Sequence, residues 1–365
     1  MKKFISILTA LAMTYTGMFF SKPNAICEDK SGSEPIKIMA IGDSITDGYG
    51  VTGSYRKYLY NELTKKGYNI DMVGSKGNDM KIEFSDAETG ESFTYDDDNT
   101  GYSGYTIKEY PGRNGILETL KSTNCIENCK PDIVILQIGT NNIIDNYDAK
   151  KNHSDLEELI DYILGNISDT STLFVTTIPD VDPNRQEVYD WFSNYRHSAD
   201  WQTNYSDEEA EEEIIKQLII YNSNLKALVQ KKIVVKIASN WDITTERESP
   251  DIKDLDGPYL RYADVASVIT NVKTQLMDGV HPNNNGYKLM GEYWADQIDK
   301  YLSGQTVEII QYKVSDLVEL QKFILGKPSE MYSYRFLDKY DLNGDETVDI
   351  FDLVLLRKEL IKNSK

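Results

Sequence analysis

Short apolar strands alternate with helical patterns along most of this 365-residue chain, and this alternation constrains the fold more than any other feature. Runs rich in apolar and β-branched residues predict strands at 36–41, 69–73, 133–138, 173–178 and 233–237. Apolar residues at helical spacing predict helices near 55–63, 154–164, 208–230 and 287–301. Largely apolar strands that alternate with helices are typical of a parallel sheet covered on both faces. We therefore predict an α/β fold in which ligands bind at the carboxyl ends of the strands.

Two glycine-containing stretches follow the first two predicted strands. Residues 48–53 match the G-x-G-x-x-G pattern of dinucleotide-binding proteins, but residues 42–47 separate them from the strand that the pattern should follow directly. We therefore predict a flexible glycine loop there. The Asp- and Gly-rich stretch from about 74 to 105 predicts a surface loop.

The chain is acidic and begins with a segment typical of export. It has 59 Asp and Glu against 39 Lys and Arg, a net charge of −20, which argues against nucleic acid or an anionic membrane as partner. Residues 1–25 start with two lysines and continue into an apolar run that is shorter than the ~20 residues of a membrane span. We therefore expect a signal peptide at 1–25, a linker at 26–35 and a secreted, extracellular protein without a membrane attachment after cleavage.

The three cysteines are too few for a disulfide scaffold. In an exported chain, Cys125 and Cys129 can bridge a short loop and leave Cys27 unpaired. Three reduced thiols are the alternative, and the sequence leaves both open.

A serine and a histidine suggest nucleophilic catalysis. Ser44 follows the first predicted strand, where its hydroxyl faces the ligand crevice, but a serine needs a base within hydrogen-bond reach. Of the three histidines, His153 precedes a predicted helix and His197 lies in an acidic, aromatic segment. His281 has a carboxylate, Asp278, three residues upstream that can fold back and orient the imidazole. We predict that Ser44, His281 and Asp278 are catalytic.

Donors for a developing oxyanion are expected near other strand ends. Gly101 lies in a turn with a second glycine three residues later, and Asn141 follows the predicted strand at 133–138. The backbone N–H groups of Ser44 and Gly101 and the side-chain amide of Asn141 would make a three-donor hole. This chemistry requires no catalytic cofactor.

Residues 36–303 resemble an SGNH (GDSL-type) hydrolase. Four motifs carry the resemblance: Gly42-Asp43-Ser44-Ile45, Gly101-Tyr102-Ser103-Gly104, Gly139-Thr140-Asn141-Asn142 and Asp278-Gly279-Val280-His281-Pro282. The resemblance implies a three-layer, flavodoxin-like α/β/α fold, a nucleophilic Ser44, and the roles given above to the other site residues. Asn142 stands where the family usually has Asp.

Within that family the sequence is similar to carbohydrate esterase family 3, the acetyl xylan esterase type. Three further stretches carry this similarity: 55–59, 67–75 and 101–107. The segment 182–213 is longer than the family usually has there. Its aromatic residues can form a wall against sugar rings or pack as a cluster of their own: Trp191, Phe192, Tyr195, Trp201 and Tyr205.

The C-terminal segment contains a calcium-loop pattern. In 341–352, oxygen-bearing side chains occupy positions 1, 3, 5, 9 and 12, and a backbone carbonyl occupies position 7, as a Ca²⁺ ion requires. The expected ligands are Asp341, Asn343, Asp345, Thr347, Asp349 and Asp352. Glu346 replaces the glycine usual for the sharp turn.

A short repeat accompanies this loop, because 314–320 parallels 350–356 and pairs Asp316 with Asp352. Two such copies resemble a dockerin, the module that binds cohesins on a cellulosome scaffold. The first copy lacks the ligands, so one structural Ca²⁺ is expected. A helical hairpin with an incidental acidic turn is the alternative. We divide the chain into an esterase domain at 36–304 and a small all-α dockerin-like domain at 305–365.

The sequence thus predicts a secreted serine esterase that deacetylates plant cell-wall polysaccharide, with acetylated xylan as the expected substrate, anchored to a cellulosome through a cohesin. An enzyme of the same fold acting on feruloyl, lipid or peptidoglycan acetyl esters is one alternative. A non-catalytic carbohydrate-binding or assembly component is another, although the intact catalytic residues argue against it.

Overall fold

The computed structural model describes residues 34–77, 80–86, 89–197, 202–240 and 257–304, with a few isolated residues beyond 304. The predicted signal peptide, nearly all of the predicted linker and the six expected calcium ligands lie outside the described residues. The same holds for Trp201 of the aromatic segment.

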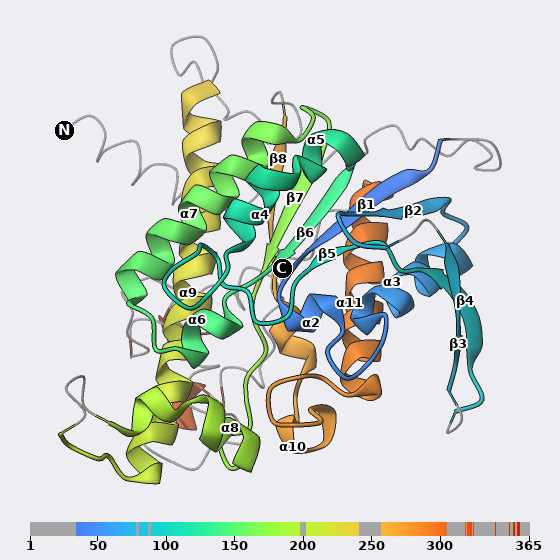
Figure 1. Cartoon of the computed structure of the whole chain (residues 1–365). Helices are drawn as coiled ribbons and strands as arrows, with labels where there is room; N and C mark the ends of the chain where they lie inside the picture. The colour runs from blue at the N-terminus through green and yellow to red at the C-terminus, as the bar shows by residue number, and fades with distance from the viewer. Residues whose placement is uncertain are drawn as a thin grey trace.

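A parallel sheet forms the centre of the described part (Figure 1). Its main strands, in spatial order, are β2 (Ile70–Val73), β1 (Ile36–Gly42), β6 (Ile133–Gln137), β7 (Thr172–Thr176) and β8 (Tyr259–Ala263). The short β5 (Thr100–Gly101) pairs with the carboxyl end of β1. The strand order reverses between β1 and β6, so the crevice that binds ligands in such sheets lies at the carboxyl ends of these two strands.

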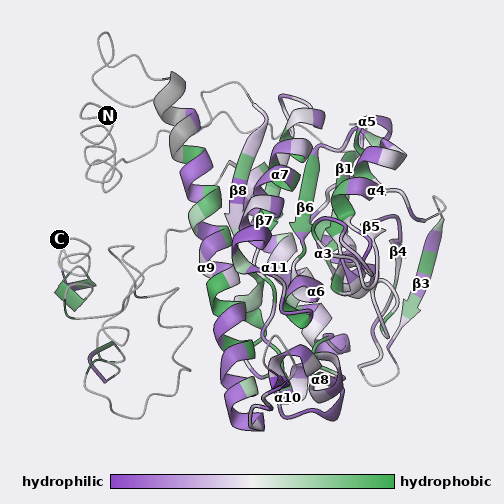
Figure 2. Ribbon diagram, turned by 60° about the vertical axis from the view of Figure 1, so that its left-hand side comes forward, coloured by the Kyte–Doolittle hydropathy of each residue, from purple (hydrophilic) through white to green (hydrophobic). Residues whose placement is uncertain are grey.

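Helices cover both faces of this sheet, as the sequence predicts. One face carries α3 (Ser54–Lys65) and α11 (Asn284–Leu302). The other carries α4 (Ile116–Thr123), α5 (Cys125–Cys129), α7 (Ala149–Asn166) and α9 (Asp207–Asn240). In Figure 2 the central strands β1 and β6 are coloured as hydrophobic, in keeping with their burial on both faces. The three-layer α/β/α fold is therefore confirmed for this part.

Each face of the sheet has its own hydrophobic core. On one side, Tyr287, Met290 and Trp294 of α11 are fully buried together with Leu59 of α3. These α11 residues recur at helical spacing, so a single stripe of the helix faces the sheet. On the other side, α7 and α9 bury aliphatic side chains such as Leu159. The two cores hold the sheet rigid, and with it the loops at the carboxyl ends of its strands.

One predicted strand is wrong. Residues 233–237 belong to helix α9, and the fifth parallel strand is β8, which follows a stretch outside the described residues. A short apolar run with β-branched residues fits a strand or a buried helix equally well, and the preceding helix continues through it. β8 has an intermediate exposure at three of its five positions, as an edge strand should, and so lacks an apolar run that would identify it.

The stretch 74–105 contains more structure than the predicted loop. β3 (Lys81–Ser85) and β4 (Ser92–Asp96) form an antiparallel hairpin in which Phe84 pairs with Phe93. The two rings lie 5.0 Å apart, and both contact Tyr58 of α3. The hairpin thus packs its alternate apolar residues on the helix, and the polar residues between them form its other face.

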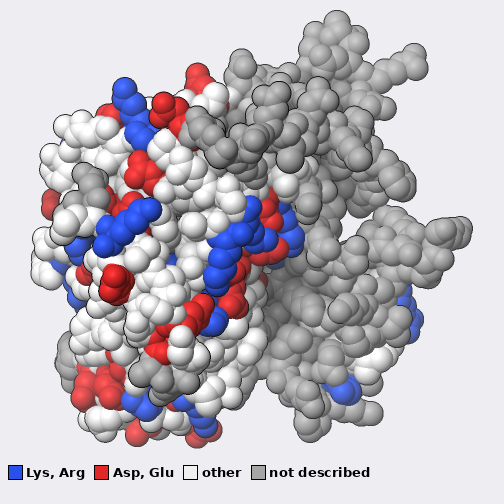
Figure 3. Space-filling view, turned by 90° about the vertical axis from the view of Figure 1, so that its right-hand side faces the viewer, with Lys and Arg blue, Asp and Glu red and all other residues white. Residues whose placement is uncertain are grey.

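The surface shown in Figure 3 carries acidic and basic side chains in alternation. Ion pairs link α3 and α11 to the turn of the hairpin: the Lys65 Nζ lies 3.6 Å from a Glu91 oxygen, and the Lys288 Nζ lies 2.9 Å from the other Glu91 oxygen. The excess of acidic residues is therefore not gathered into one patch there. In the described part of the chain, none of the helices has the length and apolar character needed to cross a membrane.

The cysteines of α5 are not bridged. Cys125 and Cys129 stand at the two ends of this helix and are free thiols. For this pair, the structure has the reduced form that the sequence left as one of two possibilities.

Candidate active site

Ser44 stands at the carboxyl end of β1, where the chain turns into the short helix α2 (Ser44–Asp47). Asp43 caps this helix, since its Oδ1 accepts the Ile45 N–H at 3.0 Å. The Ser44 N–H lies in the first turn of the helix and has no acceptor within it. Both the hydroxyl and the N–H of Ser44 are thus placed at the crevice.

Asp278 and His281 share one loop, between α10 (Val272–Gln275) and α11. Asp278 Oδ1 accepts the backbone N–H groups of Val280 and His281, at 3.0 and 2.7 Å. The Met277 N–H donates to the His281 carbonyl at 2.9 Å and closes the loop. The backbone therefore holds the carboxylate directly beside the imidazole.

These side chains form a continuous hydrogen-bonded chain with Ser44. His281 Nδ1 lies 2.8 Å from Asp278 Oδ2, and His281 Nε2 lies 2.8 Å from Ser44 Oγ. An ionised carboxylate can only accept, so Nδ1 carries the proton, Nε2 accepts, and the Ser44 hydroxyl donates to it. The structure brings the three predicted residues together in the order needed to move a proton from serine to imidazole.

The partly buried Asp278 of this hydrogen-bonded chain and the fully buried Asp43 beside it differ in their pKa. Burial acts to raise the pKa of Asp278, but hydrogen bonds from the His281 side chain and backbone outweigh it and hold the pKa below its ordinary value. Burial raises the pKa of Asp43 to about 6, against the opposing hydrogen bond from the Ile45 N–H. Asp278 is thus the permanently ionised partner of His281 at neutral pH, whereas Asp43 takes up a proton in mildly acidic solution.

A cavity of about 230 Å³ opens in front of Ser44. It is lined by Ser44, Tyr49, Ser103, Gly104, Arg113, Asn141, Ile144, Trp191 and His281. Asn141 lies in α6 (Thr140–Ile144), which follows β6, and its Nδ2 donates to the Tyr105 carbonyl at 2.8 Å. An amide nitrogen has two hydrogens, so the second is left for a ligand. Asn141 therefore lies where the sequence predicts it.

Gly101 does not lie where the sequence predicts it. Its N–H donates to Asn99 Oδ1 at 2.8 Å, and the residue is absent from the cavity wall. A Cβ on Gly101 would lie 2.5 Å from the Asp47 nitrogen, so glycine is needed there for the close approach of β5 to α2. Gly101 is therefore a packing glycine, and its N–H is not available as an oxyanion donor.

Gly104 takes the place expected for Gly101. The Tyr105 N–H donates to the Tyr102 carbonyl at 3.1 Å, which closes a turn with Gly104 in its third position at a φ of +80°. That is the position at which a type II turn needs glycine. Within the described residues, the Gly104 N–H has no acceptor, and it faces a cavity shared with Ser44 and Asn141. The sequence signal was the second glycine of the same motif.

Asn142, which stands where the family usually has Asp, supports the loop after Gly104. Its Oδ1 accepts the Ile107 N–H at 3.1 Å, so the loop after Gly104 is tied to α6. Asn142 is fully buried. The departure from the family pattern therefore leaves this connection in place.

The aromatic segment divides into two parts. Phe192, at the end of α8 (Gln186–Trp191), and Tyr195 of the 3₁₀ helix η1 (Ser193–Arg196) are buried, so they form a cluster of their own. Trp191 is 36% exposed and lines the cavity, with its ring edge-on to His281 at 5.7 Å. Tyr49, from the glycine loop between α2 and α3, contacts the same imidazole at 4.5 Å. His281 thus lies beside two partly exposed aromatic rings.

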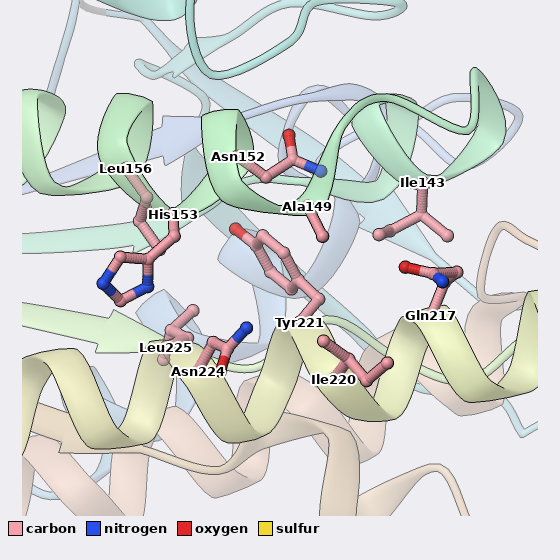
Figure 4. Close-up of a pocket in the computed structure, with 10 residues that line it drawn as sticks. All are labelled: Ile143, Ala149, Asn152, His153, Leu156, Gln217, Ile220, Tyr221, Asn224 and Leu225. Atoms are coloured by element: carbon pink, nitrogen blue, oxygen red, sulfur yellow. The ribbon is translucent and has the colours of Figure 1, made fainter.

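A second cavity lies between α7 and α9 (Figure 4). His153 lines it from within α7, whereas the sequence predicts that His153 precedes the helix. Tyr221 of α9 also lines it, and its hydroxyl donates to the Ile138 carbonyl at 2.5 Å. The third histidine, His197, lies with its Nδ1 2.7 Å from Asn204 Oδ1. Through Tyr221, this cavity wall supports the turn that carries Asn141. Of the three histidines, His281 is the one that contacts Ser44.

The fold and the site define a class of protein. Residues 38–294 match the family of GDSL-like lipases and acylhydrolases, and the chain belongs to that family. Residues 38–294 thus form a domain of the GDSL-type lipase and acylhydrolase class.

Individual relatives are similar over different lengths. A multidomain esterase of Ruminococcus flavefaciens is 35% identical over 370 residues, which span the whole of this chain but 40% of the relative. Among solved structures, a family 3 carbohydrate esterase of Clostridium thermocellum is 26% identical with a TM-score of 0.45, over 74% of this chain and 100% of that one. A family 3 carbohydrate esterase from Talaromyces cellulolyticus is 17% identical with the same TM-score and the same two coverages.

Proposed function

We propose that the protein is a secreted serine esterase that removes acetyl groups from plant cell-wall polysaccharide, with acetylated xylan as its substrate. The observation that carries the esterase mechanism is the chain Asp278–His281–Ser44, whose two side-chain contacts are both 2.8 Å. Its serine faces a cavity that also contains Asn141 and Gly104.

In the first half of the reaction, Ser44 Oγ attacks the ester carbonyl carbon while its proton passes to His281 Nε2. The carbonyl oxygen becomes an oxyanion and accepts hydrogen bonds from the Ser44 N–H, the Gly104 N–H and Asn141 Nδ2. His281 then gives the proton to the sugar oxygen as the carbon–oxygen bond breaks, and the acetyl group remains on Ser44.

In the second half, a water molecule attacks the acetyl carbon and passes its proton to His281. The same donors hold the new oxyanion. The bond to Ser44 then breaks, Oγ takes the proton back, and acetate leaves. Asp278 stays ionised throughout and stabilises the imidazolium, in keeping with its lowered pKa.

The aromatic rings beside His281 support a sugar as the alcohol part of the ester. Trp191 and Tyr49 are 36% and 49% exposed, and both rings contact the imidazole that protonates the leaving oxygen. An aromatic face is a suitable surface for the C–H groups of a sugar ring, because it is apolar, flat and rigid. A leaving sugar can therefore rest on these rings. The sequence resemblance to carbohydrate esterase family 3 supports the same substrate class.

Acetate release from acetylated xylan by wild type and Ser44→Ala tests this proposal. We expect wild type to release acetate and Ser44→Ala to lose at least about 10⁴-fold in kcat, since the nucleophile acts as a unit with its base. Full activity of Ser44→Ala would contradict the mechanism. Faster hydrolysis of a long-chain ester than of acetylated xylan would instead favour a lipid substrate. Stoichiometric labelling of Ser44 by a phosphonate excludes a non-catalytic role.

We further propose that residues 305–365 form a dockerin-like module that binds one structural Ca²⁺ and attaches the enzyme to a cohesin of a cellulosome. The support is the ligand pattern in 341–352 and its partial repeat at 314–320. Removal of calcium with a chelator should abolish cohesin binding and leave ester hydrolysis largely intact. Loss of both activities together would contradict two separate modules.

A further inference from the structure

We propose that Arg113 and Asp145 are positioning residues that hold two oxyanion donors, Gly104 and Asn141, at a fixed separation. This inference rests on the proposed esterase function. Neither residue belongs to the four motifs, and both reach the site from outside them, Arg113 from a loop and Asp145 from the end of α6.

The two side chains form a rigid pair. Arg113 Nε lies 2.6 Å from Asp145 Oδ2, and Arg113 Nη2 lies 2.6 Å from Asp145 Oδ1. The Tyr110 hydroxyl donates to Asp145 Oδ2 at 2.6 Å. A two-bond contact between a planar guanidinium and a carboxylate fixes direction as well as distance. The side chain of Arg113 is 28% exposed and that of Asp145 is 22% exposed, so the pair is partly shielded from water.

Each member of the pair is attached to one donor. Arg113 Nη1 donates to the carbonyl of Gly104 at 3.3 Å. The backbone N–H of Asp145 donates to the carbonyl of Asn141 at 3.0 Å, in the single turn of helix that presents the Asn141 amide. The ion pair therefore connects the turn that carries Gly104 to the helix that carries Asn141.

The peptide that contains the Gly104 N–H is held on its other side as well. Asp47 Oδ2 accepts both the N–H and the hydroxyl of Ser103, at 3.3 and 2.7 Å. Asp47 belongs to α2, the helix that begins with Ser44. The peptide groups before and after the Gly104 N–H are thus anchored, to α2 and to Arg113, while that N–H itself is left for the substrate.

Oxyanion stabilisation depends on donors that are already in place when the charge develops. A misplacement of about 1 Å can cost on the order of 100-fold in rate. Because Asp145 neutralises the Arg113 fork through two bonds, the guanidinium is a poor site for a substrate anion. We therefore expect loss of the Arg113 side chain to act through the position of Gly104. It should lower kcat and leave substrate affinity nearly unchanged.

Steady-state kinetics of Arg113→Met and Asp145→Asn on p-nitrophenyl acetate test this inference. We expect each variant to lose about 10- to 100-fold in kcat, less than deletion of an oxyanion donor, with KM changed by less than about threefold. The double variant should be no slower than the slower single variant, since both changes break one unit. The rate of phosphonate labelling of Ser44 should fall in the same proportion as kcat.

Lys108→Met is the matched control. Lys108 lies in the same loop, and its Nζ forms an exposed ion pair with Glu158 at 2.7 Å. This variant removes a cationic side chain of the loop without touching Gly104 or Asp145, so its kcat should remain that of wild type. Thermal unfolding of all variants shows whether they are folded, and Asp145→Asn, which keeps the shape of the side chain, decides the question where Arg113→Met fails to fold.

Three results would overturn the inference. A rise in KM at constant kcat would make Arg113 a substrate-binding residue, and multiplicative losses in the double variant would show that the two residues act independently. Ser44→Ala is measured in parallel. If it retained activity, the proposed function itself would fail, whereas an inactive Ser44→Ala beside fully active Arg113 and Asp145 variants would overturn this inference alone.

Discussion

The two halves of the candidate site are built in different ways. The proton-transfer half consists of three side chains, and two of them, Asp278 and His281, belong to one short loop whose own hydrogen bonds hold them together. The oxyanion half consists of donors from three separate segments: α2, the turn at Gly104 and α6. Two of these donors, the N–H groups of Ser44 and Gly104, are backbone groups. The turn that carries the Gly104 N–H is held by residues elsewhere, Asp47 and Arg113.

This difference determines which substitutions should impair each half. The proton-transfer half fails when one of its own side chains is changed. The oxyanion half can lose its geometry through residues that are not themselves oxyanion donors. The following experiments compare the two halves, from the largest expected effect to the smallest.

The largest effect is expected in the proton-transfer half, for Asp278→Asn. An amide in this position can donate to Nδ1, which favours the wrong imidazole tautomer, so kcat should fall by about 10⁴-fold. Steady-state kinetics on p-nitrophenyl acetate measure this loss. A loss of less than tenfold would mean that Asp278 does not orient His281 during the reaction.

A smaller effect is expected in the oxyanion half, for Asn141→Ala. Removal of one oxyanion donor leaves the proton relay intact, so kcat should fall by about 10²- to 10³-fold with little change in KM. The same ester and the same assay apply. An Asn141→Ala variant as slow as Asp278→Asn would remove the distinction between the two halves.

Asp43 borders the proton-transfer half and should make the stability of the protein depend on pH. Its pKa is raised from 3.8 to about 6, so the native protein holds this proton over a pH range in which the unfolded chain has released it. Stability from this group is therefore present at pH 4 and is lost as the pH rises through 6. Asp43→Asn, which keeps an acceptor for the Ile45 N–H, should raise the free energy of unfolding by about 2–3 kcal/mol at pH 8 and by little at pH 4.

Urea unfolding of wild type and Asp43→Asn at both pH values measures this difference. A gain that is equal at pH 4 and pH 8 would show that the ionisation of Asp43 is not its cause. Activity is a second readout. Asp43 interacts favourably with the charge of His281, so the more stable variant should be the slower enzyme.

The smallest effect is expected for Trp191→Ala, which changes neither half of the chemistry. Loss of the ring beside His281 should lower kcat/KM on acetylated xylan by about tenfold, through KM, and leave p-nitrophenyl acetate hydrolysis unchanged. Tyr205→Ala is the control, because Tyr205 belongs to the same aromatic segment and is 45% exposed but does not line the cavity. Equal losses on both esters would assign Trp191 a structural role.

The two halves also differ in what their sequences reveal. Asp278 and His281 are three residues apart, so their partnership is local and can be predicted from spacing. Gly101 and Gly104 are both glycines of one turn motif, and nothing local shows that the first is needed for close packing and the second for its positive φ. Arg113 is 32 residues from Asp145, so their contact is determined by the tertiary fold.

The fold shows the same limit. The strands β1, β6 and β7 are buried on both faces, and their apolar runs identify them. The edge strand β8 has no such run, and the apolar residues 233–237 continue a helix. Burial on both faces makes a strand visible in the sequence, whereas an edge position removes that signal.

The closed loop of Asp278 and His281 has a consequence for how such an enzyme can change over generations. The Met277 N–H bond to the His281 carbonyl and the bridge between Leu276 and Pro282 close the loop of Asp278 and His281 by its own backbone contacts. We call this closed loop the clasp. Chain inserted upstream of the clasp leaves the spacing of acid and base intact. The same insertion between Gly104 and Arg113 would move an oxyanion donor. New substrate-binding segments can therefore accumulate beside α8 and β8, while the loop around Gly104 has to keep its length.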